Sequence, residues 1–116
     1  MASRSEQILK ELNKTDGVHE SLIVGRDGFV IDHAGDMDSE SVGAIVSTAI
    51  GTVEAMGRDA KQGELFEFMA EYKDGVMIIA PVGGDAVLGI VAEAGANLGR
   101  IRHDVKKNLR ELERVL

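Results

Sequence analysis

Cysteine is absent from this chain of 116 residues, and its absence excludes several kinds of site. Disulfides, thiolate metal centres, iron–sulfur clusters and cysteine nucleophiles all need the missing thiol. Proline occurs once and 44% of the residues are hydrophobic, so the composition is neither collagen-like nor that of a disordered linker. This length and composition predict one globular domain, residues 1–116.

Long apolar runs are also missing. No run approaches the ~20 residues that a membrane-spanning helix needs. The first residues, MASRSEQILKELNK, carry charges where a signal peptide has an uninterrupted apolar core. We therefore predict a cytoplasmic protein with no membrane insertion.

Positive charge is scarce, because 13 Lys and Arg stand against 20 Asp and Glu, for a net charge of −7. Such a field repels phosphate backbones and anionic lipid, which disfavours nucleic acid and membranes as partners. The charge is unevenly placed, since residues 96–116 carry +3 and residues 1–95 carry −10. The basic face of the last segment is either a solvated surface or a site for an acidic partner, and it is centred on Arg102, Lys106, Lys107 and Arg110.

Motifs that carry catalysis are missing as well. Neither G-x-x-x-x-G-K-[ST] nor G-x-G-x-x-G occurs, so a phosphate cradle has no support. A calcium loop beginning at Asp36 would need Gly and Glu where the chain has Ser41 and Ser47, which favours a helix-capping loop instead. The three histidines lack the i, i+4 spacing of a zinc pair, and no G-x-S-x-G elbow marks a nucleophile. We predict no enzyme activity, no metal and no cofactor.

The chain begins with a helix signal, and a hairpin signal follows it. Ser3-x-x-Glu6 is a possible capping box ahead of apolar residues at helical spacing, which stop at the turn-forming residues 15–17. Two apolar runs, 18–24 and 29–31, are joined by an Asp-Gly turn, which is typical of a β-hairpin.

Residues 36–59 have the period of a helix, with Asp38 as its N-cap. Its apolar stripe, which we expect to face the core, consists of Val42, Ile45, Val46, Ala49, Ile50, Val53 and Met56.

Three strand-like runs follow, 63–73, 76–82 and 86–92, separated by Asp-Gly and Gly-Gly turns, and a last amphipathic helix begins at Asn97. The order α-β-β-α-β-β-β-α predicts an α+β fold, an α/β sandwich with a central five-stranded antiparallel sheet. The two later strand runs are apolar without alternation, so helices should cover both faces of this sheet.

The second helix indicates a partner. From Val42 to Val53 it has no charge, although a helix packed on one face would show charge opposite its core stripe. Small residues spaced by three or four lie on the other side and allow a second helix to approach, namely Ala44, Ser47 or Thr48, Gly51 and Ala55. We predict a homodimer with paired second helices.

The run 63–73 looks like an edge strand, whose acids limit unwanted pairing. In a symmetric dimer it could pair with its copy and extend one sheet across both subunits, although Glu67 and Glu71 near the axis oppose that. The predicted dimer edge consists of Leu65, Phe66, Glu67, Phe68 and Met69.

The chain resembles the roadblock domain family. The resemblance rests on the element order, on GRDGFVI (25–31) running into the acidic loop and the charge-free helix, on PVGGDAVLGIV (81–91), and on GANLGRIR (95–102). The family comprises dynein light-chain, Ragulator-type and prokaryotic gliding-motility proteins that work with small Ras-like GTPases.

The resemblance implies a homodimer with a shared sheet, the two second helices on one face and the first and last helices on the other. It also implies that the paired second helices bind a Ras-like GTPase and that a bacterial member can stimulate hydrolysis. By position, the dimer seam or docking face would comprise Ala44, Ser47, Thr48, Gly51, Glu54, Ala55 and Arg58. Arg58 is either a trans-acting arginine or a charge that favours the helix C-terminus.

These observations lead to one functional hypothesis with two alternatives. The leading hypothesis is a noncatalytic homodimeric regulator or scaffold that binds a small Ras-like GTPase and modulates its GTPase activity or localisation. One alternative is a small-molecule sensory module, which needs a cavity between the sheet and a helix. The other is a structural adaptor of the dynein light-chain type, whose binding ignores the nucleotide state.

Overall fold

The computed structural model describes residues 2–116. The elements in chain order are α1 (Arg4–Leu12), β1 (Val18–Gly25), β2 (Val30–Ala34), α2 (Ser39–Asp59), β3 (Phe68–Tyr72), β4 (Gly75–Val82), β5 (Ala86–Glu93) and α3 (Leu98–Val115). This is the predicted order, so the α+β prediction is confirmed.

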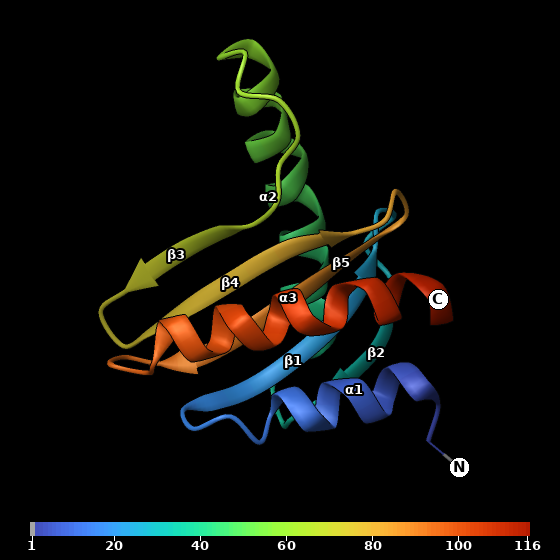
Figure 1. Ribbon diagram of the computed structural model, residues 1–116, viewed down its shortest axis with the longest axis vertical. Coiled ribbons are helices and arrows are strands. Elements are labelled where there is room, and N and C mark those ends of the chain that lie inside the picture. The colour runs from blue at the N-terminus through green and yellow to red at the C-terminus, as the bar shows by residue number, and fades with distance from the viewer. Residues whose placement is uncertain (1) are drawn as a thin grey trace.

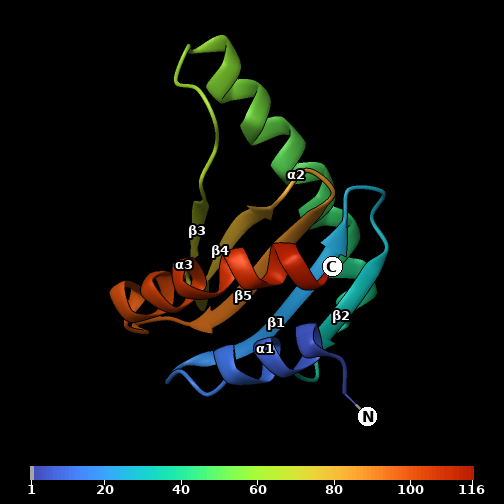
Figure 2. The same cartoon turned by 45° about the vertical axis from the view of Figure 1, so that its right-hand side comes forward.

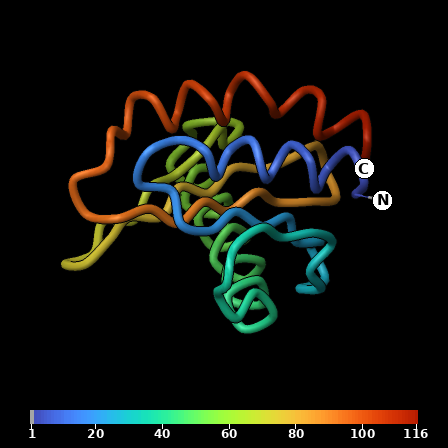
Figure 3. Tube along the Cα trace, turned by 90° about the horizontal axis from the view of Figure 1, so that it is seen from below, coloured from blue at the N-terminus to red at the C-terminus, as the bar shows by residue number. Residues whose placement is uncertain are grey.

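The five strands form one antiparallel sheet in the order β2-β1-β5-β4-β3. Helices α1 and α3 lie side by side on one face of the sheet, and α2 crosses the other face (Figure 1). Figure 3 shows the same layers edge on. Strands β2 and β3 are the two edges of the sheet.

The core has two parts, one on each side of the sheet. The larger part joins α1 and α3 to the strands through buried residues such as Leu9, Leu88 and Val105. The smaller part lies under α2 and includes Val46 and Ile50. The three helices therefore divide unequally between the two faces.

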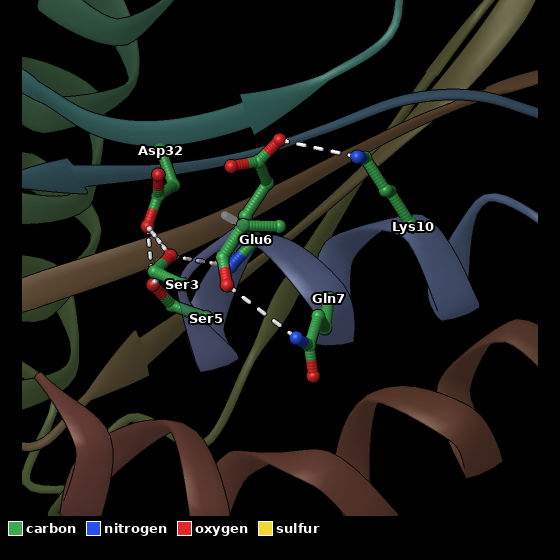
Figure 4. Close-up of polar contacts among 7 residues, drawn as sticks. Ser3, Ser5, Glu6, Gln7, Lys10 and Asp32 are labelled. Carbon is green, nitrogen blue, oxygen red and sulfur yellow. Dashed lines mark hydrogen bonds and ion pairs between the residues drawn. The ribbon is translucent and has the colours of Figure 1, made fainter.

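Each helix begins at a capping residue, and two of the three, Ser3 and Asp38, were predicted. The side chains of Ser3, Asp38 and Asn97 accept hydrogen bonds from backbone amides three residues further on. At the first cap, Ser3 and Ser5 both donate to the carboxylate of Asp32 on β2, as Figure 4 shows. This contact ties the start of α1 to an edge of the sheet.

The predicted strand 63–73 is too long, and this is a correction. Leu65, Phe66 and Glu67 precede β3, which pairs with β4 only from Phe68 to Tyr72. Continuing the register would place Phe66 opposite Pro81, which has no N–H for the ladder. The ladder therefore stops at Phe68.

The predicted core stripe of the second helix is also partly wrong. Gly43, Val46 and Ile50 are buried, but Ile45 is 70% exposed and Met56 is 63% exposed. The C-terminal half of α2 extends beyond the strands (Figure 2). Met56 lies in this half, whereas Ile45 is exposed because it lies on the side of α2 that points away from the buried residues.

The remaining differences are at element ends. The second strand begins at Val30 and continues to Ala34, so Phe29 belongs to the hairpin turn rather than to the strand. No helix in the described part of the chain is both long and apolar enough to cross a membrane.

Candidate partner-binding surface

The outer face of α2 is an apolar surface without charge. The segment Val42–Val53 has no charged residue, and Ala44, Thr48 and Gly51 are exposed on it. A Cβ added at Gly51 would have no heavy atom within 4 Å. We call the exposed set of Ala44, Ile45, Thr48, Gly51 and Met56 the α2 outer face.

Close packing of α2 on the sheet fixes which face points outward. A Cβ added at Gly43 would lie 3.0 Å from Cγ2 of Val30 on β2, so the helix backbone packs directly on that side chain. Val46 and Ile50 follow on the same side of the helix and are buried. With Gly43, Val46 and Ile50 all facing the sheet, residues about 140° away around the helix, such as Ile45 relative to Ile50, must point outward.

An ion pair holds α2 to the β1–β2 turn. Arg26 donates from Nη1 and Nη2 to the Glu54 carboxylate at 2.5 and 3.1 Å. The hydrogen bond from Arg26 lowers the pKa of Glu54, and the same bond raises the pKa of Arg26. The Ser47 hydroxyl also donates to the backbone carbonyl of Arg26 at 2.8 Å.

The predicted seam residues divide into two groups. Ala44, Thr48, Gly51 and Arg58 are exposed and lie open to a partner, and Ala55 is half-buried. Ser47 and Glu54 are occupied by Arg26 within the same chain. The assignment of the whole set to a dimer or GTPase interface stays a prediction.

Sequence reasoning missed Ile45 and Met56 as surface residues. A stripe of seven apolar residues is wider than the side of a helix that one sheet can bury. The two residues are 11 apart, so they stand about 20° from each other around the helix, on the same side. The large angle around the helix between these two residues and the buried Ile50 is the signal that would have separated them from the core.

The β3 edge is a second exposed apolar region. Phe66 is 76% exposed and Met69 is 43% exposed, whereas Leu65 and Phe68 pack against the smaller core. Glu67 makes an ion pair with Arg102 on α3, which neutralises one of the two acids at this edge. Only Glu71 keeps its unpaired charge among the described residues of the strand.

The histidine side chains, which could act as catalysts or metal ligands, are dispersed over the molecule. His33 lies 3.4 Å from the buried Glu20 carboxylate, His19 lies 3.8 Å from Glu93, and His103 is exposed on α3. Residues 2–116 contain no group of three His, Asp or Glu that could hold a metal. A groove of about 830 Å³ between α1 and α3 is lined mainly by charged and amide side chains, which does not match an apolar ligand site.

Comparisons with known proteins agree with this geometry. Residues 4–92 match the family model of the Roadblock/LC7 domain. Uncharacterized protein MJ0310 of Methanocaldococcus jannaschii is 36% identical over 104 residues, covering 88% of this chain and 90% of that protein.

Two solved structures share the fold. Myxococcus xanthus MglB is similar with a TM-score of 0.87 at 19% identity, covering 95% of this chain and 92% of that one. The Roadblock/LC7 domain from Streptomyces avermitilis is similar with a TM-score of 0.88 at 13% identity, covering 94% of each chain.

Proposed function

This chain belongs to the Roadblock/LC7 domain family, and from that premise we propose that it is a noncatalytic homodimeric regulator of a small Ras-like GTPase. The observation that carries the proposal is the α2 outer face, where Ile45 is exposed within the charge-free segment 42–53 and Met56 is exposed three residues beyond it. Large apolar side chains in one patch mark an interaction surface. We infer that the protein acts in the cytoplasm.

In the proposed dimer, the two α2 helices pack together and the two β3 strands pair. Ala44, Thr48 and Gly51 would allow close approach of the helix backbones, and Ile45 and Met56 would supply the apolar contact. Pairing of β3 with its copy would cover the unpaired backbone groups of that edge. The Glu67–Arg102 ion pair supports this pairing because it removes one source of repulsion near the axis.

The GTPase would bind on the paired α2 helices, as the family resemblance implies. The regulator would act by organising the residues of the GTPase, as the family resemblance implies for bacterial members. Arg58 is exposed near the end of α2, where its charge favours the helix C-terminus, and a trans-acting arginine is the alternative role for it.

The dimer is tested by Gly51→Arg. A Cβ added at Gly51 meets no packed neighbour within 4 Å, so the subunit should fold normally while the arginine blocks a second helix. Sedimentation velocity should show a dimer for the wild type and a monomer for the variant. Gly84→Arg is the matched control, because Gly84 is equally open but lies in the β4–β5 turn. A dimeric Gly51→Arg protein would overturn the proposed seam.

GTPase binding is tested by capture from source-cell lysate with GDP or a nonhydrolysable GTP analogue. We expect a Ras-like GTPase to be enriched with the analogue on wild type and on Gly84→Arg, and to be lost on Gly51→Arg. Equal capture in both nucleotide states would favour the structural adaptor. A metabolite that raises the melting temperature, with no GTPase captured, would favour the sensory module.

A further inference from the structure

We propose that the α1/α3 face of the protein docks on an anionic lipid membrane, held by a basic stripe on α3. The site is distinct from the α2 outer face and lies on the opposite side of the sheet. The proposal depends on the proposed function in one respect only: a dimer would present two basic stripes to the membrane instead of one.

The chain gathers most of its basic residues in its two terminal segments. Nine of the 13 Lys and Arg, but only five of the 20 Asp and Glu, lie in residues 3–14 and 97–116, which form the α1 and α3 segments. Those two segments therefore carry +4 and the rest of the chain −11, although Asp32 and Glu67 of the rest contact α1 and α3. The net charge of −7 conceals this concentration of cations.

Most cations of these two segments are already paired. Ion pairs join Arg4 to Glu111, Lys10 to Glu6, Lys14 to Glu11, Arg100 to Asp104 and Arg102 to Glu67. These pairs neutralise the flanks of α3 and leave its outer side as the source of the positive field.

The basic stripe consists of the exposed residues His103, Lys106, Lys107, Arg110 and Arg114. At about 100° per residue they fall within about 100° of the helix circumference, and at about 1.5 Å per residue they span about 16 Å. No ion pair joins any of them to an acid among residues 2–116. The neighbouring Glu113 lies against the β4–β5 turn, where its Cγ would be 3.2 Å from a Cβ at Gly83.

An array of like charges at i, i+4 spacing repels itself and is relieved by an anionic surface. Helix α3, which carries the stripe, is the outermost element on this side of the sheet in the edge-on view (Figure 3). Between His103 and Arg114 it presents no apolar side chain, which a stable protein interface would need at its centre. It also presents no aromatic side chain to stack on a base. A layer of lipid headgroups requires only the cations that the stripe supplies.

The acidic side of the molecule does not prevent this docking. The chain measures 27 Å across its shortest axis, the direction in which Figure 1 looks through α3 onto the sheet. Charges are screened over about 8 Å at physiological ionic strength, so the acids behind the sheet act weakly at the outer surface of α3. From the net charge alone we predicted that anionic lipid repels the protein. The local charge on α3 replaces that prediction with attraction to anionic lipid.

The proposed dimer would double the stripe. Antiparallel pairing of β3 with its copy places the two-fold axis perpendicular to the sheet, so both α3 helices would lie on the same face. The membrane would then hold one face of the dimer, and the α2 outer faces would point away from it toward a GTPase.

The test is co-sedimentation of the full chain with vesicles of phosphatidylcholine, alone or mixed with phosphatidylglycerol. Each cation near an anionic surface strengthens binding about 5-fold, so Lys106→Gln/Lys107→Gln should weaken binding to mixed vesicles about 25-fold per subunit. The control is Lys61→Gln/Lys73→Gln, which changes the net charge equally but lies outside the α1/α3 layer, and it should bind like the wild type.

Binding to mixed vesicles alone, weakened by added salt and by the stripe variant but not by its control, would support the proposal. Equal binding to neutral vesicles, equal losses in both double variants, or capture by polyglutamate or RNA without vesicle binding would overturn it. Sedimentation velocity without vesicles tests the dimer separately. A monomeric wild type would contradict the dimer, and vesicle binding by that monomer through the stripe would still support the membrane site.

Discussion

At the scale of single residues, Gly35 illustrates how a buried charge constrains its neighbours. Gly35 has a φ of +126°, and a Cβ there would lie 2.0 Å from Oε2 of Glu20. The Glu20 side chain is 1% exposed. Its Oε2 accepts a hydrogen bond from the backbone N–H of Met37 at 3.1 Å. The other oxygen has no hydrogen-bond partner in the described residues, although His33 Nδ1 lies 3.4 Å away.

We expect Gly35→Ala to lower the free energy of unfolding by about 2–4 kcal/mol, because it combines backbone strain with displacement of a buried carboxylate. Urea unfolding measures this change. The comparison is Gly84→Ala, where an added Cβ meets nothing within 4 Å and no left-handed φ is imposed. Equal stability of the two alanine variants would contradict the packing described around Glu20.

The Arg26–Glu54 pair gives a second prediction at this scale. Since the hydrogen bond from Arg26 lowers the pKa of Glu54, the stabilising contribution is complete above the carboxyl's unfolded pKa. It is lost as the pH falls through the lower folded pKa. We expect Glu54→Gln to cost about 1 kcal/mol at pH 7, and the stabilities of variant and wild type should converge once the pH is below the folded pKa of Glu54.

Urea unfolding of both proteins across this pH range measures the effect, with Glu64→Gln as the control for removal of an exposed carboxylate. A stability difference that stayed constant from neutral to acid pH would show that the lost interaction is not the ion pair.

At the scale of the elements, local signals predicted the helix starts and the hairpin, because caps and turns are decided by a few adjacent residues. Ser3, Asp38 and Asn97 are examples, since each caps the helix that follows it. The end of the predicted strand 63–73 was wrong because pairing depends on the opposite strand, where Pro81 stands. The exposure of Ile45 was not predicted, because the width of the helix face that is buried depends on the sheet against which α2 packs.

The connection between α2 and β3 is fixed by the ion pair of Glu67 with Arg102. We expect Arg102→Glu to lower the free energy of unfolding by about 1 kcal/mol, because it places two carboxylates together. The double variant Glu67→Arg/Arg102→Glu should recover most of that loss, since the pair is then restored with reversed charges.

Urea unfolding of the four proteins in this cycle gives the coupling energy. A coupling near zero would mean that the connection is held by the apolar contacts of Leu65 and Phe68 alone.

At the scale of the whole molecule, periodicity and element order were enough to predict the fold, because an apolar face must be buried wherever it occurs. Two properties of the surface depend on the assembled chain. The positive α1/α3 layer brings together residues from both ends of the sequence, so the net charge does not reveal it. The exposure of Met56 depends on how far α2 extends beyond the strands (Figure 2).

The proposed dimer makes stability a property of concentration. If folded subunits are stabilised by association through the α2 outer face, mass action raises the melting temperature with protein concentration. A tenfold increase adds about 1.4 kcal/mol to the association term, which corresponds to about 3–6 °C for a dimer of this size. Scanning calorimetry over a wide concentration range should show this rise for the wild type and for Gly84→Arg.

Gly51→Arg should instead melt at one temperature throughout, because its subunits cannot associate through α2. Arginine is also the better helix former by almost 1 kcal/mol, so the variant should exceed the wild type in stability at concentrations too low for association. The two melting curves would then cross as concentration increases. A wild-type melting temperature that does not depend on concentration would contradict the proposed dimer contact of Ile45 and Met56. Crossing curves would identify the burial of these residues in the dimer as the source of the added stability.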